Sequence, residues 1–174
     1  DGAVAGTIGC AKDEASTTCG NVFAKLTSDG SYVAGIYVDS LANTGRISGN
    51  RFEGELLAKG GSARGISSLG AVAGTLGCAE NEANISTCAN TFVDITSTVG
   101  GAYGLYILGT FSGTNASIRH NTFNVTASSD AKKAYGIYFD TALSVANASK
   151  VQHNKLRVTA GTDNSNAFGF RYFS

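Results

Sequence analysis

Four cysteines are the residues with the clearest chemistry in this sequence of 174 residues. They form two close pairs, Cys10 with Cys19 and Cys78 with Cys88. Such pairs fit either two local disulfides or thiolates that bind a metal ion. Neither pair has the Cys-x-x-Cys spacing and no histidine lies near either pair, so we predict two disulfides. Disulfides indicate a secreted protein at an extracellular, periplasmic or cell-surface address.

An internal duplication supports local pairing of these cysteines. Residues 3–11 read AVAGTIGCA and residues 71–79 read AVAGTLGCA, so the two pairs occupy equivalent positions. We expect each disulfide to staple a surface loop. Closing so short a loop restrains the unfolded chain by roughly 2–3 kcal/mol.

Two histidines could bind a metal ion or sense pH if they were stacked. His120 and His153 stand at equivalent positions, each directly before an asparagine. Two ligands without a nearby carboxylate or thiol make a poor metal site, and Gly20, Gly49 and Ala89 fill the position elsewhere. Packing at a corner of the fold is therefore the favoured interpretation, with no metal ion and no cofactor expected.

Acidic side chains could perform acid–base chemistry on a glycosidic bond, which needs two carboxylates at a defined separation. The acids that we expect on the outside are scattered without a paired cluster: Asp39, Glu53, Glu55, Asp94 and Asp140. We therefore predict that the protein is not an enzyme. A polysaccharide-degrading or carbohydrate-binding protein is the alternative.

A repeat positions all of these residues. Five asparagines are each followed 14 or 15 residues later by a glycine and a large apolar residue: Asn21, Asn50, Asn90, Asn121 and Asn154. A regular period of this length is typical of repeat units that stack to bury a core. The sequence thus predicts a single domain over residues 1–174, with five coils centred on these asparagines.

One coil is easiest to follow from residue 133 to residue 166. Alternating apolar and polar residues predict strands, and polar runs of small residues predict loops. The predicted order is a strand at 134–139, a long loop at 140–149, a short strand at 150–153, a corner at Asn154, a strand at 155–159 and a loop at 161–166. A β-sandwich would suit the composition, but it does not explain the fixed spacing from asparagine to glycine.

Stacked coils place inward side chains in three apolar columns. The first column is predicted to hold Ile36, Ile66, Leu105, Ile137 and Phe170. The second column is predicted to hold Phe23, Phe52, Phe92, Phe123 and Leu156. The third is predicted to hold Ile47, Ile118 and Val151, with Thr18 and Thr87 in the two coils that carry cysteines.

The asparagines are expected to serve both the corner and the stack. A one-residue corner needs a left-handed backbone conformation, which asparagine tolerates better than most residues. Its amide can also hydrogen-bond to the asparagines of neighbouring coils and form a ladder.

The corner motif reads Ile47-Ser-Gly-Asn50-Arg-Phe52, Ile118-Arg-His-Asn121-Thr-Phe123 and Val151-Gln-His-Asn154-Lys-Leu156. It resembles the corner of the right-handed parallel β-helix proteins, the superfold of the pectate lyases, whose coils carry stacked asparagines. The resemblance implies an all-β, right-handed parallel β-helix with three strands per coil. It covers nearly the whole chain, and it is specific for fold rather than for activity.

Two outward features suggest contacts with partners. A column of Tyr37, Tyr106, Tyr138 and Arg171, with Ser67 in the remaining coil, could stack on surface glycans or bury itself against a partner. It could equally stabilise neighbouring strands. Four Asn-x-Ser/Thr sequons could carry glycans: Asn84, Asn115, Asn124 and Asn147.

Composition excludes other partners. The net charge is zero at a pI near 6.9, so neither nucleic acid nor an anionic membrane is an expected partner. No apolar run approaches the ~18 residues of a membrane span.

The chain ends suggest a structural role. Joining Ser174 to Asp1 reproduces the internal sequence from Gly65 to Gly74 almost residue for residue. We therefore expect a whole number of coils with uncapped ends, which either stack head to tail into a homopolymeric filament or belong to a longer β-helix such as an adhesin stalk.

Overall fold

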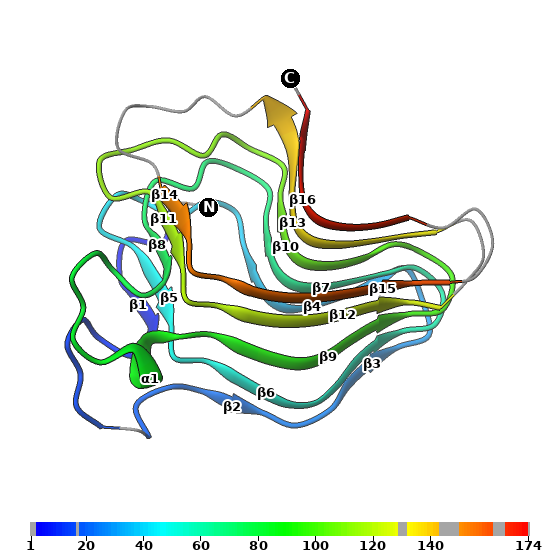
Figure 1. Cartoon of the computed structure of the whole chain (residues 1–174), viewed down its shortest axis with the longest axis horizontal. Coiled ribbons are helices and arrows are strands. Elements are labelled where there is room, and N and C mark those ends of the chain that lie inside the picture. Colours follow the sequence, from blue (N-terminus) through cyan, green and yellow to red (C-terminus); the bar gives the residue numbers. More distant parts are fainter. Residues whose placement is uncertain (1–2, 17, 129–131, 143–149, 162–165, 174) are drawn as a thin grey trace.

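The computed structural model in Figure 1 describes residues 3–16, 18–128, 132–142, 150–161 and 166–173. Its strands form three parallel sheets, which are the three sides of a stack of five coils (Figure 1). Each coil contributes one strand to each sheet, except that the first coil contributes two short strands to the second sheet. The predicted parallel β-helix is confirmed.

The three sheets are named in the order in which each coil visits them. The first sheet contains the short strands β1 (Thr7–Gly9), β5 (Arg46–Ser48), β8 (Thr75–Gly77), β11 (Ser117–Arg119) and β14 (Lys150–Gln152). The second sheet contains β2 (Val22–Phe23), β3 (Leu26–Ser28), β6 (Arg51–Ala58), β9 (Thr91–Ser97), β12 (Thr122–Ala127) and β15 (Lys155–Ala160). The third contains β4 (Tyr32–Val38), β7 (Ser62–Ser68), β10 (Ala102–Ile107), β13 (Lys133–Ala142) and β16 (Asn166–Phe173).

The first two predicted columns are confirmed by the strand register. Ile36, Ile66, Leu105, Ile137 and Phe170 are successive partners in the third sheet. The phenylalanines of the second column stack ring on ring, with centroids 4.3, 4.2 and 5.2 Å apart from Phe23 to Phe123. Burying aromatic rings in continuous contact is a major contribution to the core.

The third predicted column was wrong in the two coils that carry cysteines. Ile8 and Leu76, not Thr18 and Thr87, align with Ile47. Each cysteine loop leaves the helix after the short strand has already supplied its inward residue. The residue three positions before the asparagine therefore belongs to the cysteine loop and is not the inward residue of the short strand.

The long loops between the third and first sheets add a further inward column. Val4, Leu41, Val72 and Phe111 are successive parallel bridge partners. Leu41, Val72 and Phe111 are buried in the same core as the strands. These loops are therefore also stacked in register, although the sequence pattern predicts no core residues in them.

The predicted corner geometry was displaced by one residue. The left-handed backbone belongs to Gly49, His120 and His153, with φ of 68°, 58° and 56°, and none of the five ladder asparagines has a positive φ. The asparagine instead aims its amide into the stack. Glycine is needed at residue 49, because a Cβ there would collide with the sulfur of Cys10.

Candidate functional site

The asparagine ladder is confirmed and has a direction. The Nδ2 of each asparagine donates to the Oδ1 of the asparagine in the next coil, at 2.9–3.0 Å from Asn21 through to Asn154. Interior asparagines also donate to a backbone carbonyl of the preceding coil, as Asn90 does to Ile47 at 2.8 Å. All amides therefore point the same way along the helix axis.

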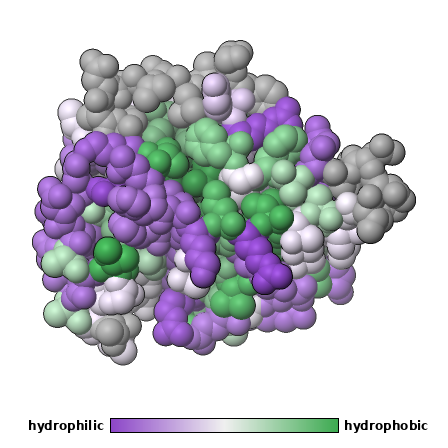
Figure 2. Space-filling model, viewed as in Figure 1, coloured by the Kyte–Doolittle hydropathy of each residue, from purple (hydrophilic) through white to green (hydrophobic). Residues whose placement is uncertain are grey.

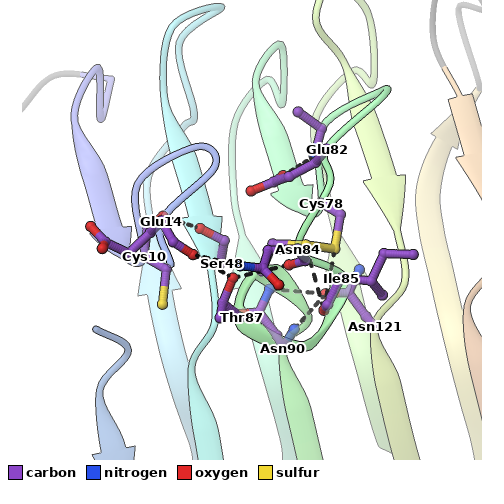
Figure 3. Close-up of a disulfide and its surroundings, with 12 residues drawn as sticks. Cys10, Glu14, Ser48, Cys78, Glu82, Asn84, Ile85, Thr87, Asn90 and Asn121 are labelled. Atoms are coloured by element: carbon purple, nitrogen blue, oxygen red, sulfur yellow. Dashed lines mark hydrogen bonds between the residues drawn. A yellow bond between two sulfur atoms is a disulfide. The ribbon is translucent and has the colours of Figure 1, made fainter. Parts of the chain in front are cut away.

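Both predicted disulfides are confirmed, Cys10–Cys19 and Cys78–Cys88. They close the first cysteine loop (residues 10–19) and the second (residues 78–88), which ends in the short helix α1 (Ile85–Cys88). Figure 3 shows the loops meeting, where the Thr87 hydroxyl donates to the Glu14 carbonyl at 2.9 Å. Cys78, Cys88 and Glu82 are close enough to surround a metal ion, but the disulfide removes both thiolates.

A buried ion pair between the cysteine loops was missed from the sequence. The Arg46 Nη2 donates to both carboxylate oxygens of Glu82, at 2.6 and 2.7 Å, and the Glu82 side chain is 0% exposed. Backbone N–H groups of Asp13 and Ala79 also donate to this carboxylate. The available signal was that Glu14 and Glu82 both lie four residues after the first cysteine of their loop.

The two histidines do lie side by side. The rings of His120 and His153 are 4.8 Å apart at the corner. Burial, followed by the neighbouring His153 and Arg119, lowers the pKa of His120. In the described part of the chain no cysteine or carboxylate joins them to make a three-ligand cluster.

The outward acids are less scattered than expected. Glu55 and Asp94 are register partners in β6 and β9, because a register shift after Phe52 brings them level. Glu55 also forms an ion pair with Lys25 at 3.3 Å. These two acids therefore lie level on neighbouring strands, which the predicted scatter did not include.

The predicted tyrosine column is present on the outside of the third sheet. Tyr37, Ser67, Tyr106, Tyr138 and Arg171 are successive partners. The rings of Tyr106 and Tyr138 stack at 5.4 Å, and both hydroxyls donate to Asp140, at 3.0 and 2.8 Å. Tyr37 is 43% exposed, so one end of the column faces solvent.

A second outward column packs against the first. It contains Ala34, Arg64, Tyr103, Tyr135 and Phe168, three residues earlier in each coil. Tyr103 stacks on Tyr135 at 5.0 Å and meets Tyr106 edge-on at the same distance. The guanidinium of Arg64 lies 4.0 Å from the Tyr106 ring. Together the two columns form an aromatic cluster outside the helix. The sequence predicted only the first of the two columns.

Burial of this aromatic cluster predicts sensitivity to alkali. Burial raises the pKa of Tyr103 to about 12, with smaller contributions from Tyr135 and Tyr106. Burial and then Asp140 also raise the pKa of Tyr106. Unfolded tyrosine ionises at a pH of ~10, whereas the folded protein holds the Tyr103 proton more tightly. The folded state therefore keeps its full stability below that pH and loses stability relative to the unfolded state as the pH rises toward 12. We expect the free energy of unfolding, measured in urea, to fall steeply over this range.

The matched control is Tyr103→Phe, which keeps the stacked ring and removes the titrating hydroxyl. Its free energy of unfolding should fall less steeply with pH than that of the unchanged protein. Equal slopes would show that Tyr103 ionises alike in both states. The ultraviolet absorbance of the phenolate follows the ionisation directly.

Three sequons lie in described residues, and Asn147 lies outside them. Asn84 precedes α1 in the second cysteine loop, Asn115 lies in the long loop before β11, and Asn124 lies in β12. Each Nδ2 donates to a backbone carbonyl, at 3.5 Å from Asn84, 3.1 Å from Asn115 and 2.8 Å from Asn124.

The two end coils are the least covered parts of the core. Phe170 in β16 is 43% exposed, whereas its column neighbour Ile137 is buried. Figure 2 shows hydrophobic residues gathered in the middle of this face, within the turn that β14, β15 and β16 outline in Figure 1. At the opposite end, Phe23 and Leu26 are only partly buried.

No protein-family model, curated protein or solved structure matches this chain. Among the described residues, no helix is long and apolar enough to cross a membrane. The two disulfides are consistent with an extracellular protein.

Proposed function

We propose that this chain is an extracellular structural protein whose end coils dock head to tail, as in a filament subunit or the stalk of a surface adhesin. The observation that carries the proposal is the pair of end coils, whose described residues present parallel strand edges and partly buried apolar columns. Uncapped solenoid ends favour further stacking of like units. Docking of unlike faces generates open rods rather than closed rings.

The direction of the ladder supports head-to-tail docking. Within the described residues, the Oδ1 of Asn21 accepts no hydrogen bond, and the Nδ2 of Asn154 donates only to the Ile118 carbonyl. The Nδ2 of an interior asparagine such as Asn90 donates both to a backbone carbonyl of the preceding coil and to the asparagine of the next coil. An Asn154 amide placed against Asn21 of a second copy would extend the ladder by one step.

The apolar columns of the two ends are complementary as well. Leu156 and Val158 end the two columns that Phe23 and Leu26 begin, and all four are partly buried. Covering them would remove apolar surface from water at about 25 cal/mol per Å². The same docking would cover Phe170.

Charges at the two ends match an interaction already present inside the stack. Arg46 and Lys150 hold the same register position in the first sheet. In the interior, Arg46 binds Glu82 of the next coil's cysteine loop. Glu14 is the equivalent of Glu82 in the first cysteine loop, so docking would bring Lys150 of one copy toward Glu14 of the next.

Electron microscopy of the purified chain tests the proposal. We expect filaments with a rise of ~24 Å per subunit, from five coils at ~4.8 Å each. Only discrete monomers at all concentrations would contradict head-to-tail docking.

Variants that block one edge each make the test sharper. Phe170→Asp blocks the last coil and Leu26→Asp blocks the first, so neither variant alone should form filaments. Mixed in equal amounts, the two variants keep one intact pair of edges and should form dimers. Val93→Asp, on an exposed outer position of β9, is the matched control and should still polymerise.

A further inference from the structure

A polar pocket opens on the outer face of the first sheet. Its volume is about 360 Å³, near the lower end of the roughly 300–1,000 Å³ typical of ligand sites. Arg46, Thr75 and Ser117, successive along one outward column, form its floor. The walls come from the cysteine loops, including Lys12 and Glu80, and from the long loops that carry Asn43 and Asn115.

The floor carries polar groups whose hydrogen bonds are incomplete. The Ser117 side chain lines the pocket, the residue is 8% exposed, and no described residue forms a hydrogen bond with its hydroxyl. Buried hydroxyl groups of proteins almost always have a partner. Arg46 uses its Nε and Nη2 in hydrogen bonds, and no described residue accepts one from its Nη1. These groups are positioned to bind a polar ligand.

The pocket is positively charged. Its lining contains the cations Lys12, Arg46 and Lys150 and the single carboxylate Glu80, which forms an ion pair with Lys150. Glu82 neutralises Arg46 from behind the floor. Counting these five groups leaves one net positive charge, and Lys12 forms no ion pair with a described residue.

Next to the pocket the positive charge increases. Arg119 is the last residue of β11, directly before His120, and no described residue accepts a hydrogen bond from its buried Nε and Nη1. It acts on Glu80, whose pKa is lowered first by the Lys150 hydrogen bond and charge and then by Arg119. The surroundings therefore favour a ligand with a negative charge.

We propose that this pocket binds an acidic sugar, with the sugar carboxylate at Lys12 and Arg46 and the sugar hydroxyls at Ser117 and Thr75. A single carboxylate matches the single net charge, and charge-assisted hydrogen bonds are the strongest available here. The neutral hydroxyl and amide groups of the floor and walls require a ligand with hydroxyls of its own. The inference does not depend on head-to-tail docking.

Titration of the full chain with glucuronic acid, followed by amide NMR shifts, tests the proposal. We expect shifts at Thr75, Ala116 and Ser117, and about 10–100-fold weaker binding in Lys12→Gln, which loses a charge-assisted hydrogen bond. Ser117→Ala should weaken binding by roughly 3–10-fold without loss of stability. Lys59→Gln is the control: it removes an exposed lysine in the loop between β6 and β7, and it should leave the affinity unchanged.

Several results would overturn the proposal. These are the absence of shifts at tens of millimolar glucuronic acid, equal affinity for uncharged glucose, or equal affinity in Lys12→Gln. Inorganic sulfate that binds as tightly as glucuronic acid would show that only charge is recognised. Methyl glucuronide separates the two sources of the sugar: binding equal to that of the free acid indicates a sugar linked in a glycan, and weaker binding indicates the free sugar.

Discussion

Replacing Glu82 by alanine is expected to lower the free energy of unfolding by roughly 3–5 kcal/mol, because it leaves the Arg46 guanidinium buried without its counter-charge. The Arg46 Nη2 binds both carboxylate oxygens and the two side chains are 7% and 0% exposed, so little water reaches the pair. The backbone N–H groups of Asp13 and Ala79 would lose their acceptor as well. Urea denaturation at neutral pH measures the change.

Two further variants separate this explanation from a general effect on the loop. Glu14→Ala removes the equivalent acid of the first cysteine loop, whose carboxylate accepts one exposed hydrogen bond from the Ser16 N–H, and should cost far less. Combining Glu82→Leu with Arg46→Met removes both charges and should recover much of the lost stability, since buried ion pairs are often replaceable by apolar residues. A loss below about 1 kcal/mol in Glu82→Ala would show that Arg46 is hydrated in solution.

The stacking of this protein was predictable from its sequence because each structural requirement recurs once per coil. The ladder asparagines, the phenylalanine column and the glycine–isoleucine strand repeat at matching positions, and only in-register stacking explains all three. The disulfides were predictable for the same reason, since both pairs lie at equivalent points of a duplication.

Features that join different coils were not predictable in this way. Arg46 and Glu82 are separated by 36 residues, and neither residue type recurs at its position in every coil. The cysteine loops also shift the count from the asparagine, which placed Thr18 and Thr87 wrongly in the core. At the corner, the positive φ of His120 and His153 was assigned one residue too late, because asparagine tolerates that conformation better than histidine.

The cost of removing a stacked phenylalanine should depend on its place in the stack. Phe92 is 0% exposed and lies between the rings of Phe52 and Phe123. Phe92→Ala is therefore expected to lower the free energy of unfolding by roughly 3–5 kcal/mol, from the lost burial and the cavity left behind. Val93→Ala, at a neighbouring exposed position, should change it by no more than about 0.5 kcal/mol.

Phe23 holds the same column position in the first coil, but it is only partly buried and has a ring neighbour on one side. In dilute, unassembled protein, Phe23→Ala should therefore cost only roughly 1–2 kcal/mol. If a second copy covers the first coil, as proposed, the cost of Phe23→Ala should rise with protein concentration, because binding to the folded state adds to stability. The cost of Phe92→Ala should change much less. Urea denaturation of both variants over a range of concentrations measures this difference, and a concentration-independent cost for Phe23→Ala would contradict docking at that edge.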